Sequence, residues 1–423
     1  MKNIRSRALF IWLTQRYTRA RSGVLGFLGH STDTPIEIGE LRADLAAGRP
    51  ARRAEQYRQV PLQNTLLEAF SQEPLAAGDK RLIGREQELN RLLAGLDMWR
   101  KGRSTTIAVT GRQGSGLTSL LQQLAFHATP EETWHYATLK RRAYNPPDAL
   151  AMFSELLGCP QVADSMQQLV DSINNLPPRV FVIDNCHFLA SRIMGAEAAV
   201  RCFGVVVVAT QLRHMWVLGC EQYAWQRLDY LYQAKRYFDD CIELQFFNEA
   251  ELGSCLLERM RAAQLLPVIE PKVAVESTLG GAAESEPEEV PPMLTKVLVD
   301  LHKFSGGKPD LAFFYFLDCL TLNEETRQLD TRQVVQLDFS SLKHLVSDDM
   351  FTLAEVAVNG ELTVADHCAV FRSVNEKSWL LMEHLYHLSL LDKQQDADGI
   401  TYRISPLYSN VISQYLTNSN YLY

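Results

Sequence analysis

The chain has 423 residues, of which 46% are hydrophobic and 22% charged, and its formal net charge is −8. This is the composition of a globular protein long enough for two or three domains, and its acidity argues against a protein that coats nucleic acid. Its eight cysteines are scattered without a C-x-x-C pair, which argues against a zinc knuckle or redox pair and predicts a reducing, cytoplasmic location. The apolar run ALFIWL near the N-terminus is far shorter than the ~20 residues that span a bilayer, so neither a membrane span nor a signal peptide is expected.

Residues 1–58 stand apart, because eleven Lys and Arg residues face only five acidic ones there. The stretch SRALFIWLTQRYTRA predicts a short helix with an apolar and a basic face. Such a helix suits a partner protein, an anionic lipid surface or nucleic acid. It equally suits a helix that packs on its own protein and leaves its arginines in solvent, and both interpretations stay open. We predict a basic arm and helical extension over residues 1–80.

A glycine-rich turn follows an apolar strand and precedes an amphipathic helix in IAVTGRQGSGLTSLLQQLAF, which starts at Ile107. This is the layout of the phosphate-binding loop G-x-x-x-x-G-K-[ST], whose backbone N–H groups cradle phosphates. Leu117 stands where the motif has lysine, whereas Thr118 keeps the hydroxyl that reaches Mg²⁺. The alternative is a turn that only shapes the corner between strand and helix. The predicted nucleotide-binding residues of the loop are Gly111, Gly114, Ser115, Gly116, Leu117, Thr118 and Ser119.

Apolar strand candidates alternate with helical stretches on both sides of this loop. They read, in order, TTIAVT, TWHYATL, RVFVID, VVVVAT and CIELQF. Strands rich in β-branched residues that alternate with helices predict a parallel sheet covered on both faces. We therefore predict an α/β phosphate-loop domain with a five-stranded parallel sheet over residues 81–248.

The remainder of the chain is predicted to be mainly helical. Residues 249–340 read as a helical lid, interrupted by an exposed acidic loop at 279–292. Residues 341–423 read as a winged-helix domain, with a strand–turn–strand whose tip is Asp398-Gly399. Across 361–404 there are four basic and seven acidic residues. Because a DNA-reading winged helix needs basic residues, this balance favours a protein contact over DNA.

Taken in order, these segments resemble the AAA+ ATPase superfamily. The resemblance is to its initiator and STAND-like branch and to bacterial secretion and transposition ATPases, and it covers roughly residues 82–420. IGREQEL, with Gly84 and Arg85, resembles the segment that lies against adenine. VFVIDNCHFL, with Asp184, resembles the Walker B segment. The resemblance implies a P-loop AAA+ domain, a helical lid and a C-terminal winged helix.

Three further segments extend the resemblance. VVVVATQL resembles the strand that ends in sensor 1, which implies Thr210 or Gln211 at that position. KRYFDDCIEL resembles the segment that supplies an arginine finger to a neighbouring subunit, which implies Arg236. HKFSGGKPD resembles the sensor 2 helix, with Asp310 in place of its arginine.

The resemblance thus implies a bound ATP or ADP with Mg²⁺ and names the residues around it. Thr118 and Asp184 would hold the metal. The implied catalytic residues are Asp184, Asn185, Thr210 and, in trans, Arg236.

The departures from the family pattern fall on the chemistry. Leu117 replaces the lysine that reaches the β- and γ-phosphates, and Asn185 replaces the glutamate that orients the attacking water. A lost charge-assisted contact costs roughly 1.5–3 kcal/mol, and each ~1.4 kcal/mol is a tenfold change in rate. We therefore expect a degenerate, pseudo-ATPase subunit with little or no hydrolysis of its own.

Such a subunit would act by assembly with protein partners in a homo- or hetero-oligomer. Two alternatives stay open, a weak ATPase that remodels a protein or DNA complex and a DNA-binding, initiator-like or transposition-type regulator. Contact with DNA is not favoured for the winged helix, and an anionic membrane surface would be met through residues 1–58.

Overall fold

The computed structural model describes residues 68–71, 73–127, 133–263, 292–322, 329–331, 333–334, 339–396 and 399–422. The predicted basic arm at 1–58 lies outside these ranges, as do residues 279–291 of the predicted acidic loop. The described residues form two compact units. One unit contains residues 74–245, 342–386 and 390–422, and the other contains most of the residues between 246 and 341. The predicted domain boundaries at 81, 249 and 341 remain predictions.

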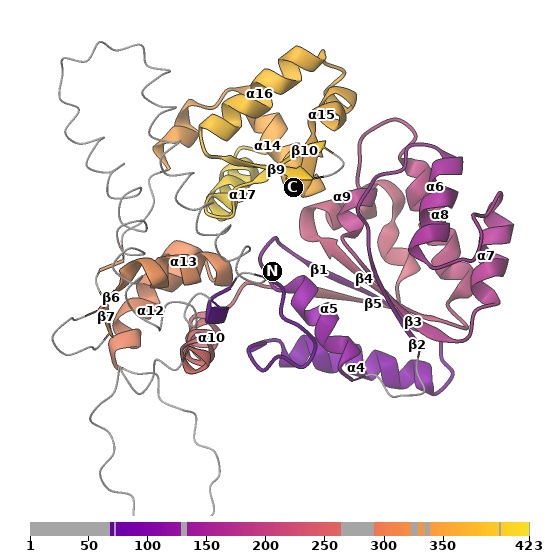
Figure 1. Ribbon diagram of the computed structural model, residues 1–423, viewed down its shortest axis with the longest axis horizontal. Coiled ribbons are helices and arrows are strands. Elements are labelled where there is room, and N and C mark those ends of the chain that lie inside the picture. The colour runs from indigo at the N-terminus through magenta and orange to yellow at the C-terminus, as the bar shows by residue number, and fades with distance from the viewer. Residues whose placement is uncertain are drawn as a thin grey trace, which may run out of the picture. The chain divides into compact units, whose positions relative to one another are not determined.

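A five-stranded parallel sheet forms the centre of the first unit, in the order β2-β3-β4-β1-β5 (Figure 1). The predicted parallel sheet is therefore confirmed. Because all the strands run the same way, their carboxyl ends share one edge, where ligands of open α/β sheets bind. The strands are β1 (Thr106–Gly111), β2 (Thr133–Thr138), β3 (Arg179–Asp184), β4 (Met215–Glu221) and β5 (Asp240–Leu244).

Helices cover both faces of this sheet (Figure 1). On one face, Leu92 and Leu96 of α4 and Leu120 of α5 pack against alternate strand residues such as Val182 and Val217. On the other face, Phe203 of α8 packs on Trp216 with ring centroids 6.0 Å apart. Alternate strand residues thus face opposite layers, as strand geometry requires. The helices are α4 (Glu86–Arg100), α5 (Leu117–Ala125), α6 (Pro146–Leu156), α7 (Met166–Asn174), α8 (Glu197–Thr210) and α9 (Gln222–Tyr232).

One predicted strand is wrong. The run VVVVAT, residues 205–210, ends helix α8, and the fourth strand is instead β4, which begins five residues later. Within the run, Val206 and Val207 are buried, whereas Val205 and Val208 each expose 46% of their surface. This spacing is that of a helix with one solvent-facing stripe, not of a strand buried on both faces. Burial of the helix over the sheet outweighs the β-propensity of valine.

The C-terminal residues of the first unit have the element order of a winged helix. Helix α14 (Ser347–Asn359) is followed by β8 (Glu361–Thr363), α15 (Val364–Phe371), α16 (Asn375–His387), β9 (Leu391–Asp396), β10 (Gly399–Ile404) and α17 (Ser409–Asn418). The strands form an antiparallel sheet in the order β8-β10-β9. The predicted hairpin is confirmed, although Asp398 at its tip lies outside the described residues.

Two buried arginines of the α/β part bind acidic residues of this winged-helix part. Arg227 forms two hydrogen bonds with the carboxylate of Glu355, at 2.7 and 3.0 Å. Arg142 pairs with Asp366 at 3.2 Å and donates to the Glu361 carbonyl at 2.7 Å. The Arg142, Asp366, Arg227 and Glu355 side chains each expose 13% or less. The winged helix is therefore built onto the sheet domain through charges shielded from solvent.

The second unit is helical, with α10 (Glu249–Ala262), α12 (Pro292–Ser305) and α13 (Pro309–Cys319), together with a short hairpin of β6 (Leu320–Leu322) and β7 (Leu329–Thr331). Helix α10 starts with a capping box, in which Asn248 and Glu251 each accept the other's backbone N–H at 2.9 Å. The predicted lid helices are thus present. Among the described residues, no helix is long and apolar enough to cross a membrane.

Candidate functional site

The glycine-rich loop joins β1 to α5 at the carboxyl edge of the sheet. Gly114 and Gly116 have φ values of +83° and +87°, a region that side chains with a Cβ rarely adopt. A Cβ on Gly111 would lie 2.4 Å from Ser115 Oγ, so the loop closes tightly on its own first residue. The helix begins at Leu117 with Gly116 as its N-cap residue. The loop therefore has the backbone shape of an anion cradle at a helix N-terminus.

Ser115 carries a buried hydroxyl inside this loop. Its side chain exposes 1% of its surface, and its Oγ has no hydrogen-bond partner among the described residues. Leaving a buried hydroxyl unpaired costs ~1–3 kcal/mol. The loop thus holds a polar atom with unused capacity to bind a ligand oxygen.

Arg85 fastens the loop from behind. Its Nη2 donates to the Ser115 carbonyl at 2.9 Å and to the Gln245 carbonyl at 2.6 Å, and only 4% of the side chain is exposed. Gly84 precedes it at a φ of +72°, and its N–H bonds with Glu86 Oε1 at 3.2 Å. Arg85 therefore joins the loop to the end of β5 as a structural group.

The lysine position is occupied by an apolar side chain that faces inward. Leu117 packs against the buried core beneath the sheet. Nearby, Arg112 donates from Nε to Gln222 Oε1 at 3.1 Å and lies 5.5 Å from the Tyr223 ring centre. Ser119 accepts the Leu75 N–H at 3.0 Å through its hydroxyl. The structure thus brings the predicted loop residues together, and the first helical side chain belongs to the core.

Asp184 ends β3 beside the loop and is almost completely buried, with 2% exposure. Its Oδ2 accepts the hydroxyls of Thr118 and Tyr136, each at 2.9 Å. Its Oδ1 accepts the N–H of Asn185 at 2.7 Å. The sequence placed Thr118, Asp184 and Asn185 at one site, and the structure brings them together. It adds Tyr136, which no motif indicated.

The predicted sensor 1 residue does not join this group. Thr210 lies at the end of α8, where its hydroxyl donates to the Val206 carbonyl at 2.8 Å and accepts from Trp216 Nε1 at 3.0 Å. Trp216 pairs with Thr106 at the start of β1. Thr210 and the adjacent Gln211 are therefore near the amino edge of the sheet, opposite the loop. The assignment of this position followed from the wrong strand and is wrong with it.

Glu221 lies beside the glycine-rich loop, although no sequence pattern indicated it. It is the last residue of β4 and pairs with Gly111, so it lies beside the first glycine of the loop. Its carboxyl group caps α9 by accepting the Ala224 N–H at 2.9 Å. Burial raises the pKa of Glu221 to about 8, despite the opposing backbone hydrogen bonds. At neutral pH this group is largely protonated, so it adds little negative charge beside a phosphate cradle.

Arg236, the predicted arginine finger, lies in a short 3-10 helix, η2 (Ala234–Tyr237), and is exposed. The next strand, β5, starts at Asp240, and Asp239 binds Thr106 at the start of β1. Arg236 therefore lies at the amino edge of the sheet, whereas the loop lies at the carboxyl edge. The geometry excludes contact between Arg236 and the loop of the same chain.

Asp310, the residue at the predicted sensor 2 position, belongs to the second unit. Its Oδ2 pairs with the buried Lys308 Nζ at 3.2 Å, and its Oδ1 accepts the Leu311 N–H at 2.8 Å. Burial raises the pKa of Asp310, with Lys308 opposing the shift. These contacts are those of a residue that shapes the start of α13.

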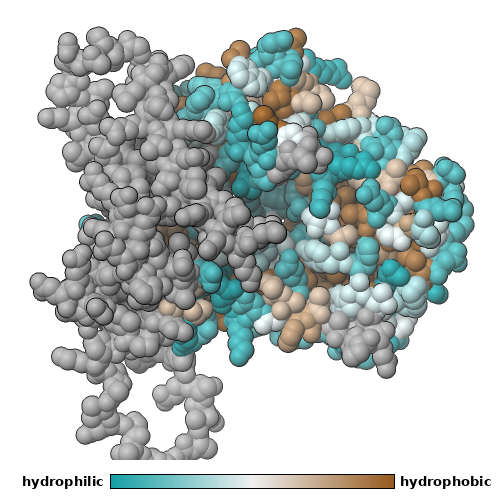
Figure 2. Space-filling view, in the orientation of Figure 1, coloured by the Kyte–Doolittle hydropathy of each residue, from teal (hydrophilic) through white to brown (hydrophobic). Residues whose placement is uncertain are grey.

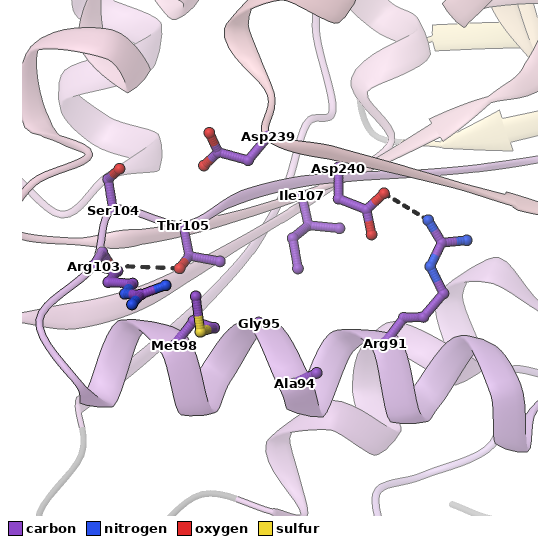
Figure 3. Close-up of a pocket in the computed structure, with 10 residues that line it drawn as sticks. All are labelled: Arg91, Ala94, Gly95, Met98, Arg103, Ser104, Thr105, Ile107, Asp239 and Asp240. Carbon is purple, nitrogen blue, oxygen red and sulfur yellow. Dashed lines mark hydrogen bonds and ion pairs between the residues drawn. The ribbon is translucent and has the colours of Figure 1, made fainter.

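A cavity of about 600 Å³ opens between α4 and the starts of β1 and β5 (Figure 3). Arg91 projects from α4 to Asp240, with 2.5 Å between Nη2 and Oδ1, while Gly95 allows the helix to approach Ile107. The cavity is at the amino edge, so it is separate from the glycine-rich loop. Its lining residues are Arg91, Ala94, Gly95, Met98, Arg103, Ser104, Thr105, Ile107, Asp239 and Asp240.

The residues that follow Asp184 are packed by the winged helix. A Cβ on Gly360 would lie 2.7 Å from His187 Nε2, and Arg142 lies 4.7 Å from the Phe188 ring centre. Burial, and to a smaller extent Arg142, lowers the pKa of His187 to about 3, so its ring is neutral. In the described ranges, no group of three or more His, Cys, Asp or Glu side chains is arranged to hold a metal.

Comparison with known proteins gives similarities of structure. No protein-family model matches the chain, and no curated protein sequence matches it. Among solved structures, the ORC2 protein of Aeropyrum pernix is 16% identical with a TM-score of 0.43, over 83% of this chain and 96% of that one. CDC6P from Pyrobaculum aerophilum is 15% identical with a TM-score of 0.36, over 84% and 98%. A Walker-type ATPase of Pyrococcus abyssi is 12% identical with a TM-score of 0.41, over 82% and 99%.

These similarities concern structure, and the chemistry of the site depends on this chain's own residues. The chain contains a parallel sheet in the order β2-β3-β4-β1-β5, with a glycine-rich loop after β1 and an acidic residue at the end of β3. Helical and winged-helix parts follow. On this evidence the chain has the α/β fold of the AAA+ ATPases.

Proposed function

We propose that this chain is a nucleotide-binding subunit with little or no ATPase turnover, which acts by assembling with protein partners. The observation that carries the proposal is the contrast within one loop. The backbone has the shape of a cradle, with Gly114 and Gly116 at positive φ, but the side chain after it, Leu117, is apolar and packs, partly buried, against the core. A cradle of backbone N–H groups binds phosphate without a lysine, whereas transfer of a phosphoryl group depends on the missing charge.

The buried hydroxyl of Ser115 supports a ligand in the loop, because it has no partner among the described residues. Raising the pH above the pKa of Glu221 would place a negative charge beside that ligand. The ligand is therefore expected to bind best when this carboxyl group is protonated. ATP and ADP are the nucleotides that we propose.

The binding test is a thermal-shift measurement with ATP and with ADP at millimolar concentration. Binding to the folded state alone raises the melting temperature. The matched control is Gly116→Val, which puts a β-branched residue at a φ of +87° and so distorts the backbone of the cradle. Circular dichroism establishes whether that variant is folded. A wild-type chain that shows no shift with either nucleotide would exclude the binding role.

The turnover test is phosphate release by the purified chain. We expect a rate indistinguishable from background, because Leu117 and Asn185 replace two groups that the reaction uses. A measurable rate that Asp184→Asn abolishes would show instead that the chain is a working ATPase.

The assembly part of the proposal rests on the surface around Arg236. On α9, Tyr230 exposes 87% and Leu231 52% of their surface. Exposed aromatic, aliphatic and arginine side chains in one short stretch are typical of the centre of a protein interface. Because Arg236 lies at the edge opposite its own loop, head-to-tail contact would bring it to the loop of a neighbouring subunit.

Sedimentation of the full chain tests this surface. We expect Tyr230→Ser with Leu231→Ser to lower the mass in solution, and Arg236→Ala to weaken assembly less. The control is Val162→Ser, which removes an equally exposed apolar side chain (58% exposed) on the loop between α6 and α7. If all of these proteins have the same mass as the wild type, α9 is not the assembly surface.

The winged helix favours a protein partner over DNA. Its third helix, α16, exposes Trp379 (49%) and Leu380 (60%), and Figure 2 shows hydrophobic residues interrupting the polar surface where Figure 1 places this helix. Lys377 pairs with Asp348 at 2.9 Å and Lys393 pairs with Glu383, so a phosphate at either lysine would compete with a carboxylate. We propose protein partners for this face, and a cytoplasmic location in agreement with eight free cysteines.

A further inference from the structure

Strand β2 brings a tyrosine hydroxyl to the acidic residue that the sequence assigns to magnesium. Tyr136 pairs in register with Val182 of β3, and Thr138 pairs with Asp184. From this position the Tyr136 hydroxyl donates to Asp184 Oδ2 at 2.9 Å. The same oxygen accepts the Thr118 hydroxyl, also at 2.9 Å. The two residues expected to hold Mg²⁺ therefore bind each other, and a third hydroxyl shares the carboxylate oxygen.

The other oxygen of Asp184 is equally occupied. Its Oδ1 accepts the Asn185 N–H at 2.7 Å. A Cβ on Gly219 would lie 2.8 Å from this oxygen, so the backbone of β4 closes the remaining side. Three neutral donors thus replace the hydration of a carboxylate that exposes only 2% of its surface. Charge-assisted hydrogen bonds of this kind stabilise a buried anion without a cation.

Thr118 and Asp184 are ligands of the type that Mg²⁺ prefers, since this ion binds oxygen and usually takes only one or two protein carboxylates. The arrangement around them does not fit the ion, because Asp184 Oδ2 accepts a metal only if the Tyr136 hydroxyl leaves.

We propose that the Tyr136 hydroxyl takes the place of a divalent cation at Asp184 and keeps magnesium out of the loop. This inference rests on the proposed nucleotide binding for one consequence only. If the loop holds ATP, it does so through backbone N–H groups and hydroxyls, and its affinity is independent of Mg²⁺. The exclusion of the cation from Asp184 itself does not depend on nucleotide.

The variant that isolates this role is Tyr136→Phe, which removes one hydroxyl and keeps the ring. The chain offers a matched control in Tyr144, whose hydroxyl donates to Asp366 Oδ1 at 2.7 Å in the same compact unit. Tyr136 exposes 38% of its surface and Tyr144 is partly buried, and both bind a carboxylate. Only the carboxylate of Asp184 lies beside the glycine-rich loop. Tyr144→Phe therefore reports the general effect of losing such a bond.

The first measurement uses Mn²⁺ as the probe, with the free ion followed by electron paramagnetic resonance in the absence of nucleotide. We expect the wild type and Tyr144→Phe to bind Mn²⁺ no better than Asp184→Asn. Tyr136→Phe should bind it at least tenfold more tightly. Wild-type binding that Asp184→Asn removes and Tyr136→Phe leaves unchanged would overturn the proposal, and so would a Tyr136→Phe protein that gains no affinity.

The second measurement compares the melting-temperature shift caused by ATP in EDTA with the shift caused by ATP and Mg²⁺. We expect equal shifts for the wild type and a magnesium-dependent shift for Tyr136→Phe. A wild-type shift that requires Mg²⁺ would overturn the metal-free role. If ATP gives no shift in either buffer, nucleotide binding fails while the Mn²⁺ comparison still decides what Tyr136 does.

Discussion

Asn185 follows Asp184 in a left-handed backbone conformation, with a φ of +59°, and donates its N–H back to the Asp184 carboxylate at 2.7 Å. Asparagine adopts this conformation more readily than other residues with a Cβ. The replacement of the expected glutamate is therefore matched to the local backbone. A glutamate here would strain the turn that positions Asp184.

The first prediction follows from this backbone. Asn185→Glu should lower the free energy of unfolding by ~1 kcal/mol, the order of the left-handed penalty. Asn185→Gly should leave it about unchanged, because glycine carries no such penalty. Urea unfolding of both variants checks this. Equal stability of Asn185→Glu and Asn185→Gly would contradict it.

The same argument bears on attempts to restore catalysis. The double variant Leu117→Lys with Asn185→Glu restores the lysine and the glutamate of the family pattern. It also brings an ammonium group to a position where Leu117 packs, partly buried, against the core, and it strains residue 185. We expect this double variant to be less stable and to gain no phosphate release. Turnover above background, abolished by adding Asp184→Asn, would show that the rest of the site is competent.

The second prediction concerns the contact between the sheet domain and the winged helix. Glu355→Ala leaves Arg227 without its carboxylate in a site where the two side chains expose 12% and 2%. Breaking a buried pair by removing one partner costs ~3–5 kcal/mol. Arg141→Ala is the control, since its pair with Asp148 is solvent-exposed at 46% and 31% and should cost ~0–1 kcal/mol. Comparable midpoints of unfolding for the two variants would show that the Arg227–Glu355 pair does not stabilise the contact between the sheet domain and the winged helix.

A companion variant separates the loss of the pair from the loss of charge. Replacing both partners, with Arg227→Met and Glu355→Leu, removes the uncompensated charge. It should recover much of the stability that Glu355→Ala loses. The measurement is the same unfolding experiment on the full chain.

The third prediction concerns pH. Burial raises the pKa of Glu221 from 4.5 to about 8 in the folded protein. The folded state therefore holds one more proton than the unfolded state between these values. The contribution of Glu221 to stability is therefore greatest below pH 4.5 and decreases as the pH rises toward 8. Glu221→Gln should remove this decrease, which exceeds ~1.4 kcal/mol because each pKa unit is worth that much.

Melting temperatures measured between pH 5 and pH 9 test this prediction, with Glu197→Gln, an exposed glutamate at the start of α8, as the control. The difference between Glu221→Gln and the wild type should grow as the pH rises. A difference that is the same at both ends of the range would mean that Glu221 does not titrate there.

The fourth prediction concerns the basic arm. Deleting residues 1–58 should leave the α/β unit folded, since all five strands of its sheet lie beyond residue 105. It should weaken assembly with acidic surfaces, and most strongly at low salt, where Coulomb attraction is least screened. Light scattering of the truncated and full chains at two salt concentrations checks this. If the truncated chain assembles as the full chain does, the arm only packs on its own protein.

The sequence predicted the parts of the site that are local in the chain. Gly111 to Thr118 lie in one strand–turn–helix, and Asp184 ends an apolar strand, so a linear pattern is enough to find both. The fourth strand was misplaced because the valines at 205–208 lie on a helix that happens to be buried on most sides. A run of β-branched residues does not distinguish these two environments by composition.

The residues that sequence reasoning missed depend on contacts between strands far apart in the chain. Tyr136 reaches Asp184 because β2 pairs with β3, and Glu221 reaches the loop because β4 pairs with β1. Neither register can be read from one strand alone. The clue that was available is weak: MWVLGCE is a short apolar run bounded by polar residues, and it ends in an acid.

The division of the chain into two units also sets an order of events during synthesis. The α/β strands end at Leu244, but the winged-helix residues that bind Arg142 and Arg227 begin only after Leu342. At ribosomal rates of ~5–20 residues per second, the intervening and final segments take roughly 10 to 40 s to emerge. During that interval the nascent sheet domain has two arginines without their acidic partners. The unit that contains the loop therefore completes its folding only after the winged-helix residues have left the ribosome.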